Sequence, residues 1–317
     1  MKVVLPGGTG QLGAMLARHF ASLGAEVVVL GRGSRHVSVG RLLSWDGKSL
    51  GPWAKELDGA DVVVNLAGRS VNCRYTSSNL HEILASRVDS TRVIGEAIAL
   101  AARPPRVWLQ ASAATIFAHG YEVAHGESSG RIGGDEPNVP SYWGAMVEVV
   151  RRWEEALSVA STRSTRRVAL RTSIVMSPDR GGAFDVLLGL VRAGLGGRAG
   201  DGRQYVSWIA DRDFVRVIDW LIERSDIEGA VNVTAPTPLP NHELMQALRT
   251  AWGAHVGLPA AKWMVSLGAW ALRTDPELVL KSRRVVPERL LEAGFQFAFP
   301  NWDDAARDLV KRWKEMR

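Results

Sequence analysis

The chain has 317 residues, of which 46% are hydrophobic and 23% are charged, so it is neither a disordered nor a collagen-like protein. Its length predicts about two lobes. The 39 Lys and Arg residues against 33 Asp and Glu residues give a net charge of +6, which suits a nucleic acid or a phosphorylated small molecule.

The richest basic stretch, residues 160–203, holds eight Arg against three Asp. Its arginines are not interleaved with exposed aromatic residues, which single-stranded nucleic acids require for stacking, so we expect no nucleic-acid partner. Arg163, Arg166 and Arg167 are expected in a solvated loop before a strand.

Three features bear on membranes and on the compartment. The longest weakly charged apolar run of the C-terminal half, residues 263–272, has about half the length of a membrane span, so no membrane partner is predicted. Residues 3–5 lead directly into a glycine loop, which predicts no secretory signal. Cys73, the single cysteine, is predicted to be a free thiol in a loop. We therefore expect a cytoplasmic protein.

The first 110 residues alternate between strand and helix patterns. Strands are predicted at 3–5, 27–30, 61–66 and 107–111, with a weaker one ending near 45–46, and helices at 11–23 and 79–102. Strands that are apolar throughout and are separated by helices indicate a parallel sheet covered on both faces. We predict a Rossmann-like doubly wound α/β fold.

The second half continues this pattern less regularly. Helices are predicted at 142–159, 214–223 and 243–252, the last with Asn241 as its N-cap, and strands at 168–175 and 229–235. We predict an NADP-binding domain over residues 1–175, with strand 229–235 joining its sheet. A smaller substrate-binding lobe is predicted over residues 176–317, with a helical region at 257–317.

Gly7, Gly10 and Gly13 follow the first strand and open the first helix, with the spacing G-x-x-G-x-x-G. Glycine permits a tight turn and lets a pyrophosphate approach the backbone, where the helix N-terminus offers free N–H groups. The alternative is a merely structural turn. The predicted dinucleotide site comprises Gly7, Thr9, Gly10, Gln11, Leu12 and Gly13.

The end of the second strand favours NADP(H) over NAD(H). No carboxylate stands there to accept the ribose 2′-hydroxyl, whereas Arg32, Ser34 and Arg35 suit a 2′-phosphate. The alternative is that the arginines point into solvent. Asp46 is a candidate acceptor for the adenine amino group. The last predicted contacts are Leu66, Ala67 and Gly68, where small residues let the cofactor lie against the sheet edge.

Residues 7–13, the segment 65–68 and Ser112 resemble the extended short-chain dehydrogenases/reductases of the NAD-dependent epimerase/dehydratase type. Further motifs resemble one bacterial subfamily, the "epimerase family proteins" with a C-terminal domain of unknown function. These motifs are Ser86-Arg87 with Thr91, Arg152-Trp153-Glu154, Gly202-Arg203-Gln204, Ser207-Trp208-Ile209, Thr234-Ala235-Pro236 and residues 287–295.

The resemblance implies a catalytic serine, matched by Ser112, and a Tyr-x-x-x-Lys pair, whose tyrosine is best matched by Tyr142. It also places Arg87 in the cofactor site. Four residues after Tyr142 stands Met146 instead of lysine, and the subfamily generally lacks the pair. A tyrosine with a pKa near 10 carries a handicap of roughly 4 kcal/mol as a base at pH 7.

Neutral Tyr142 can still donate a proton to a developing alkoxide, so we expect any hydride chemistry to run better as carbonyl reduction. The alternative is that Tyr142 only begins a helix. The glycine-rich segment 119–141 is predicted to be a mobile lid, with His125 solvated or, alternatively, acting as an acid. No metal is expected, because the seven histidines are scattered without a ligand spacing.

On the substrate side, Arg203 and Gln204 are candidates to hold a phosphate, a carboxylate or a sugar hydroxyl, unless they form a surface loop. Trp252, Trp263, Trp270 and Trp302 are expected in the core or at an interface. A homodimer through helices 79–102 and 142–159 is implied by analogy with the family.

Three functions remain open. The first is an NADP(H)-dependent oxidoreductase or epimerase acting on a small carbonyl or hydroxyl compound. The second is a cofactor-binding sensor without turnover, which the missing lysine favours. The third is a structural or interaction protein, which the intact glycine loop opposes. The fold alone does not decide among them.

Overall fold

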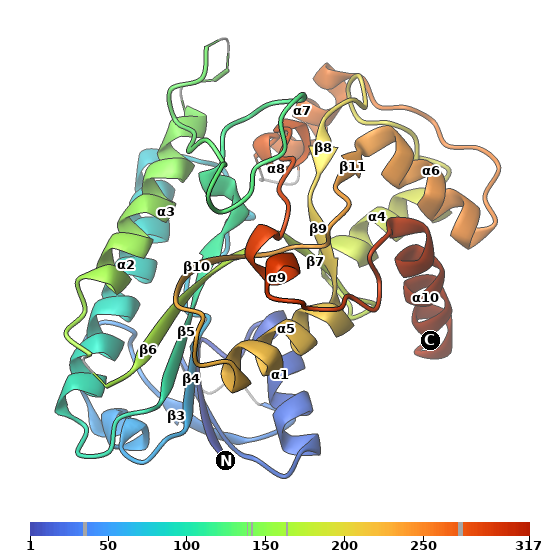
Figure 1. Ribbon diagram of the computed structural model, residues 1–317. Coiled ribbons are helices and arrows are strands. Elements are labelled where there is room, and N and C mark those ends of the chain that lie inside the picture. The colour runs from blue at the N-terminus through green and yellow to red at the C-terminus, as the bar shows by residue number, and fades with distance from the viewer. Residues whose placement is uncertain (34–36, 138, 141, 163, 272–274) are drawn as a thin grey trace.

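A parallel sheet forms the centre of the computed structural model, which describes residues 1–33, 37–137, 139–140, 142–162, 164–271 and 275–317. Its order is β10-β6-β5-β4-β1-β2-β3, and all neighbouring strands run parallel (Figure 1). The strands are β1 (Lys2–Pro6), β2 (Glu26–Gly31), β3 (Arg41–Ser44), β4 (Val62–Asn65), β5 (Val107–Ala113), β6 (Arg166–Thr172) and β10 (Gly229–Val233). The predicted Rossmann-like fold is confirmed.

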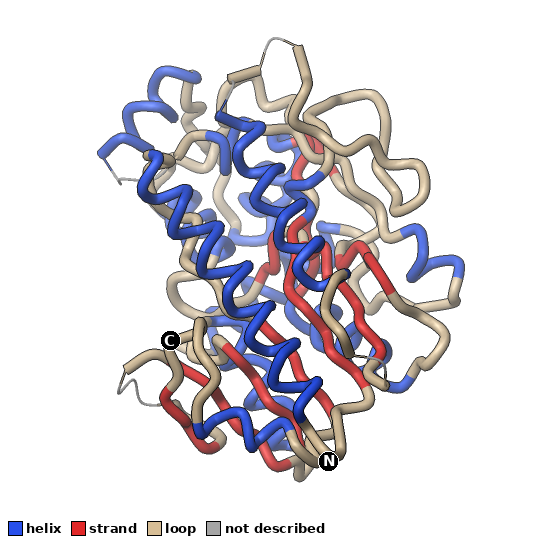
Figure 2. The backbone as a smooth tube through the Cα atoms, turned by 90° about the vertical axis from the view of Figure 1, so that its left-hand side faces the viewer, coloured by secondary structure: helices blue, strands red, loops and turns tan. Residues whose placement is uncertain are grey.

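Helices cover both faces of the sheet. α1 (Gln11–Ser22) and α5 (Asp211–Glu223) pack on one face. The other face is covered by η1 (Pro52–Leu57), α2 (Ser77–Leu100) and α3 (Tyr142–Ser158), and the two long helices cross in front of the strands in Figure 2. Because both faces are covered, the strands are apolar throughout, as Val3, Val4 and Leu5 of β1 illustrate with no exposed surface.

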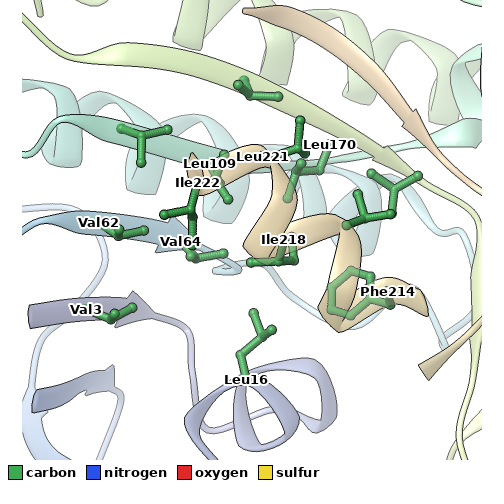
Figure 3. Close-up of a cluster of buried hydrophobic side chains, with 14 of the residues drawn as sticks. Val3, Leu16, Val62, Val64, Leu109, Leu170, Phe214, Ile218, Leu221 and Ile222 are labelled. Atoms are coloured by element: carbon green, nitrogen blue, oxygen red, sulfur yellow. The ribbon is translucent and has the colours of Figure 1, made fainter. Parts of the chain in front are cut away.

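The core between the sheet and α5 follows from the spacing of apolar residues on that helix. Phe214, Ile218, Leu221 and Ile222 recur at helical intervals and point toward strand residues of the sheet (Figure 3). Burying one such side chain contributes roughly 1.5–3 kcal/mol. This stripe fixes α5 to the sheet, although α5 comes late in the chain.

A smaller lobe lies beside the carboxyl ends of the strands, at the upper right of Figure 1. Its core is enclosed by α4 (Ala183–Arg192), α6 (Asn241–Trp252) and α10 (Trp302–Glu315). The remaining elements are η2 (Ala114–Ile116), the paired strands β7 (Ile174–Met176) and β9 (Trp208–Ala210), the paired strands β8 (Tyr205–Val206) and β11 (Leu239–Pro240), and the helices α7 (Lys262–Ala271), α8 (Glu277–Leu280) and α9 (Glu288–Glu292).

The sheet layer takes elements from both sides of residue 175. α5 lies in the same apolar cluster as the sheet, and β10 pairs with β6 at the sheet edge. Leu290 of α9 and Phe295 also return to this cluster, with exposed fractions of 0% and 5%. The C-terminal part of the chain therefore packs directly against the sheet.

Two predictions about residues 163–175 were wrong. The strand expected at 168–175 is interrupted at Ser173, because Ile174–Met176 pairs with Trp208–Ala210 instead of continuing the sheet. Arg166 and Arg167 belong to β6 and are not solvated, because their guanidinium groups donate to main-chain carbonyls of neighbouring segments. Arg163 lies outside the described residues.

Two further expectations need correction. Asn241 is the first residue of α6 and does not cap it, because its side-chain oxygen accepts a hydrogen bond from the Ala199 N–H at 2.8 Å. Trp302 is buried in the core, as predicted. Trp263 and Trp270 of α7 are 68% and 65% exposed, so the core is excluded for them and the predicted interface stays a prediction. Trp252 is half-buried. Cys73 is a free thiol in the loop before α2, as predicted.

Among the described residues, no helix combines the length and the apolar character that crossing a bilayer requires.

Candidate functional site

The glycine loop is tightly packed between β1 and α1. Gly7 has a φ of +73°, and a Cβ there would lie 2.6 Å from the Ala67 Cα. A Cβ on Gly13 would lie 2.3 Å from the Gly8 Cα. Neither position can hold a side chain, so the tight turn of this loop requires glycine there. A Cβ on Gly10, by contrast, would meet only the Gly7 carbonyl oxygen, at 3.8 Å, which leaves the backbone open at that residue. Gly10 caps α1 without a side-chain hydrogen bond, and no acidic residue lies in the first turn, which leaves this helix terminus suited to an anion.

A cavity of about 550 Å³ opens beside this loop, at the carboxyl ends of the parallel strands. That is where open α/β sheets bind their ligands. The cavity brings together most of the predicted site. The predicted residues that line it are Gly7, Gly10, Gln11, Leu12, Gly13, Leu66, Ala67, Gly68, Arg87 and Ser112. Thr9 does not line it, and its methyl group packs against Gly31.

The residues predicted to select the cofactor lie at the neighbouring strand ends, outside the cavity lining. Arg32 follows β2 and is exposed. Ser34 and Arg35 lie outside the described residues. Asp46 follows β3 and stabilises a turn, because one carboxylate oxygen accepts the N–H groups of Lys48 and Ser49 at 2.8 and 2.9 Å. These hydrogen bonds, from Ser49 first and Lys48 second, lower the pKa of Asp46.

Ser112 ends β5 at the cavity wall and is 6% exposed. Its hydroxyl donates to Glu154 Oε1 of α3 at 2.6 Å. Arg171 of β6 donates to both oxygens of the same carboxylate, from Nε at 2.9 Å and from Nη2 at 2.8 Å. Ser112 and Arg171 are register partners in adjacent strands, which explains why they meet at one carboxylate. Sequence reasoning named Glu154 only within a motif and gave it no role.

Tyr142 begins α3 but does not line the cavity. Burial raises the pKa of its phenol, and the carboxylates of Asp275 and Glu277 raise it further. The α3 face that does line the cavity is apolar, and it includes Met146 at the position where lysine is absent. Along α3, the cavity wall thus offers Met146, Val149, Val150 and Trp153, and no group that titrates.

The tyrosine that lines the cavity is Tyr75, in the segment before α2. It packs against the cluster of Ile83, Met146 and Val149. Burial raises the pKa of Tyr75, and the nearby Glu277 carboxylate raises it further, whereas the Arg283 guanidinium opposes them. Tyr75 was not predicted from the sequence, because the family resemblance points to Tyr142 and nothing local marks Tyr75.

Arg87 of α2 also lines the cavity. Its Nη1 donates to the carbonyls of Arg69 and Ile83, both at 3.0 Å, and its guanidinium lies 4.9 Å from the Trp153 ring centre. Burial lowers the pKa of Arg87 to about 10. Gly68 makes room for this group, since a Cβ there would lie 3.2 Å from the Arg87 Cζ.

The motif residues that carry the resemblance meet around Arg87. Thr91 Oγ1 donates to the Arg87 carbonyl at 2.8 Å and accepts from Trp153 Nε1 at 3.1 Å. Ser86 Oγ accepts from the Arg69 N–H at 2.9 Å. Residues of two separate sequence motifs thus form one network that holds α2 against α3 beside the cavity.

The segment 119–141 is fastened to the C-terminal part, in contrast to the predicted mobile lid. The His125 N–H donates to the Arg284 carbonyl at 2.7 Å, and the His125 carbonyl accepts from the Val286 N–H at 3.0 Å. Glu127 accepts from the main-chain N–H groups of Asn232 and Arg289. Residues 138 and 141 lie outside the described part of the chain.

His125 is not solvated, as had been expected, and is 6% exposed. It stacks on Phe117 with ring centres 5.5 Å apart, and burial lowers its pKa, so its side chain is neutral at pH 7. It does not line the cavity. The expectation failed because the partner segment, residues 284–286, is far away in the sequence.

Arg203 and Gln204 lie outside the cavity lining. Gln204 is 2% exposed, and its amide donates to the carbonyls of Ala199 and Val279 at 2.9 and 3.3 Å. Arg203 is exposed, with its guanidinium 5.8 Å from the Tyr121 ring centre. The C-terminal part instead contributes Glu277 and Arg283 to the cavity, residues that sequence reasoning did not single out. Within the described ranges, no three His, Cys, Asp or Glu side chains are grouped so that they could hold a metal ion.

Comparison with known families accounts for most of the chain. Residues 3–234 match the model of the NAD dependent epimerase/dehydratase family, and residues 260–309 match a domain of unknown function. Human epimerase family protein SDR39U1 is 30% identical, and the match covers 98% of this chain and 100% of the relative. The epimerase family protein YfhF of Bacillus subtilis is 27% identical over 98% of this chain and 98% of its own length.

Solved structures agree with these relatives. A crystal structure of human SDR39U1 with NADPH superposes with a TM-score of 0.84 at 28% identity, covering 98% of this chain and 99% of that one. The UDP-N-acetylglucosamine 4-epimerase of Bacillus cereus superposes with a TM-score of 0.74 at 14% identity, covering 99% of each chain, which is a likeness of fold alone.

Proposed function

The chain belongs to the NAD dependent epimerase/dehydratase family, and we propose that it is an NADP(H)-dependent oxidoreductase or epimerase acting on a small carbonyl or hydroxyl compound. One observation carries this proposal: the glycine loop, Ser112 and Tyr75 line the same cavity. The human relative crystallised with NADPH supports the choice of cofactor.

The residues of the cavity fit a dinucleotide. The uncapped N-terminus of α1 would receive the pyrophosphate, which the open position at Gly10 allows to approach the backbone, while Gly7 and Gly13 permit the tight turn. Arg87 has main-chain carbonyls as hydrogen-bond acceptors and no carboxylate in ion-pair contact among the described residues, so a cofactor phosphate would complete its pairing. Arg32 would bind the 2′-phosphate of NADP(H) from its exposed position after β2. When bound, the cofactor supplies or accepts a hydride.

The proton of a carbonyl reduction would come from Tyr75. Burial raises the pKa of this phenol, so it keeps its proton at pH 7 and can donate it to the alkoxide formed when the carbonyl carbon receives hydride. The carbonyl thereby gains one hydride and one proton. Tyr142, the tyrosine that the family resemblance implies, lies outside the cavity lining.

Ser112 would position the substrate oxygen. Because its own proton is donated to Glu154, its oxygen is left to accept a hydrogen bond from a substrate hydroxyl. The paired Arg171 holds the Glu154 carboxylate in place through two hydrogen bonds. This arrangement would favour one orientation of an alcohol product or substrate in the cavity.

The two tyrosines provide a direct test. We expect Tyr75→Phe to lower the rate of NADPH oxidation with a reducible carbonyl compound by about 10²- to 10⁴-fold, with NADPH affinity unchanged. Tyr142→Phe is the matched control and should retain most of the rate. The measurement is absorbance at the nicotinamide band across a panel of aldehydes and ketones. A large loss in Tyr142→Phe with none in Tyr75→Phe would contradict the assignment.

One observation favours a second function, a cofactor-binding sensor without turnover. The α3 wall carries Met146 and other apolar side chains where the family mechanism uses lysine. If the protein binds NADPH tightly but oxidises it with no member of the carbonyl panel, the sensor function is preferred.

Location and assembly are further parts of the proposal. A cytoplasmic location is favoured by the single free cysteine. A homodimer through α2 and α3 is favoured by a shallow groove of about 840 Å³ on their outer faces, which Leu84, Val88 and Val159 help to line. Light scattering of the purified protein would measure the mass directly, and a monomer at all concentrations would contradict the dimer.

A further inference from the structure

One part of the cavity wall comes from the segment that matches a domain of unknown function. Glu277 of α8 and Arg283 line the cavity beside Tyr75. Lys281 lies behind them, fully buried, with its ammonium 5.7 Å from the Trp143 ring centre. This segment thereby adds charged groups to a cavity whose α3 wall is apolar.

These three charged side chains are incompletely paired with one another. Glu277 Oε1 lies 3.4 Å from Lys281 Nζ and 3.2 Å from Arg283 Nη2, so one carboxylate oxygen serves two cations. Arg283 Nε and Lys281 Nζ are buried donors without a hydrogen-bond partner in the described part of the chain, and Glu277 Oε2 is unpaired as well. Buried polar groups are normally paired, so the cluster is incomplete by itself.

Neighbouring acids do not supply the missing acceptor. Asp275 accepts the Glu277 main-chain N–H at 2.9 Å. Glu136 accepts the main-chain N–H groups of His119 and Gly134, both at 2.6 Å. Of the cluster's two cations, Arg283 is the one that reaches the cavity, and its side chain is 14% exposed.

We propose that Arg283 binds a carboxylate group of the substrate, and that Glu277 and Lys281 position its guanidinium. This inference rests on the proposed function and assigns a substrate class to it, a carbonyl or hydroxyl compound that carries a carboxylate. Arginine matches carboxylate geometry with two parallel hydrogen bonds. The adjacent Glu277 carboxylate disfavours a doubly charged phosphate, because like charges repel in a poorly solvated site.

The test uses three aromatic probes of similar size, benzoate, benzamide and phenyl phosphate, titrated by calorimetry into the full-length protein with and without saturating NADPH. We expect benzoate to bind about tenfold or more tightly than benzamide, and more tightly than phenyl phosphate. Arg283→Gln should remove the preference for benzoate over benzamide, and Arg283→Lys should retain part of it. The matched control is Arg284→Gln, because Arg284 lies outside the cavity lining and against Tyr205.

Glu277→Gln tests the positioning role through specificity. Because this change removes the repelling charge, it should reduce the difference in affinity between benzoate and phenyl phosphate. A mere loss of packing would not produce this effect. Equal affinity of the unaltered protein for benzoate and benzamide would overturn the proposal, as would an unchanged preference in Arg283→Gln. Tightest binding of phenyl phosphate at saturating NADPH, when the cofactor phosphate sites are filled, would overturn the carboxylate assignment.

The titrations also separate this inference from the proposed function. NADPH affinity is measured in every variant, and Arg283→Gln should leave it unchanged. If NADPH binds and benzoate shows no preference, the substrate subsite fails while the cofactor assignment stands. If NADPH does not bind but benzoate binding still depends on Arg283, the cofactor assignment fails while the substrate subsite stands.

Discussion

The two sides of the cavity are built in different ways. The side with the glycine loop is made by consecutive elements, β1 and α1, whose turn leaves no room for side chains at Gly7 and Gly13. The other side joins Tyr75, before α2, to Glu277 and Arg283 in the C-terminal segment. The first side is specified by local backbone geometry, and the second depends on packing between segments that are distant in the chain.

The two regions also differ in what they bury. The core between the sheet and α5 is built from apolar side chains such as Phe214 and Ile218, whereas the C-terminal wall buries Glu277 and Lys281 at 1% and 3% exposure. Apolar burial stabilises a fold, but a buried ion pair often contributes nothing compared with packed apolar residues. The buried charges of the C-terminal wall therefore contribute less to the stability of the fold than the apolar core does. This difference agrees with the binding role proposed for Arg283.

The largest expected effect separates two tryptophans of the C-terminal part. Trp302 is 1% exposed, packs edge-on against Trp208 and donates to the Leu244 carbonyl, so Trp302→Ala should lower the free energy of unfolding by about 3–5 kcal/mol. Trp263→Ala on exposed α7 should change it by less than about 0.5 kcal/mol in the monomer. Urea unfolding measures the free energy of unfolding of both variants. A comparable decrease in the two would show that another surface covers α7 in solution.

A smaller effect tests the local specification of the glycine loop. Gly13→Ala forces a Cβ to within 2.3 Å of the Gly8 Cα, so it should destabilise the protein by about 1–3 kcal/mol and abolish NADPH binding. The control is Gly189→Ala in α4, where a Cβ meets no atom within 4 Å and helix propensity predicts a gain of about 0.5–1 kcal/mol. If both variants bound NADPH normally, the tight loop would not be the cofactor site.

The smallest effect concerns the histidines that fasten the segment 119–141. Burial lowers the pKa of His119 and His125 below the ordinary value of 6.5, so the unfolded chain takes up protons first on acidification. The two neutral histidines therefore contribute fully to the free energy of unfolding above pH 6.5. This contribution decreases as the pH falls through their lowered pKa values. The free energy of unfolding should be lower at pH 5.5 than at pH 7.5, and His125→Gln should reduce this difference. The exposed His81 provides the control, because His81→Gln should leave the pH dependence unchanged.

Most of the sheet could be predicted because its signals are local. Apolar runs marked the strands, and the spacing of Gly7, Gly10 and Gly13 marked the loop that the cavity adjoins. The helical stripe of α5 likewise follows from its own sequence, with Phe214, Ile218 and Leu221 at helical intervals. These features depend on residues within one element and its neighbours.

The missed residues have no such signal. Tyr75 lies in an irregular segment before α2 and Arg283 in another after α8, where no periodic pattern marks a side chain. His125 was misjudged because its glycine-rich surroundings resemble a mobile loop, although it pairs with residues 284–286. Glu154 was visible in a motif, but only the register of β5 and β6 brings Ser112 and Arg171 to it. Contacts between distant segments decide these positions.

The central claim, that the cavity binds NADPH, is tested most directly by titrating the protein with NADPH and NADH while following tryptophan and nicotinamide fluorescence. We expect NADPH to bind more tightly than NADH, and Arg32→Ala to weaken NADPH binding by about tenfold or more. Arg103→Ala, which removes an exposed charge before the amino end of β5, should leave it unchanged. Absence of NADPH binding, or equal binding of both cofactors that Arg32→Ala leaves unaltered, would contradict the account.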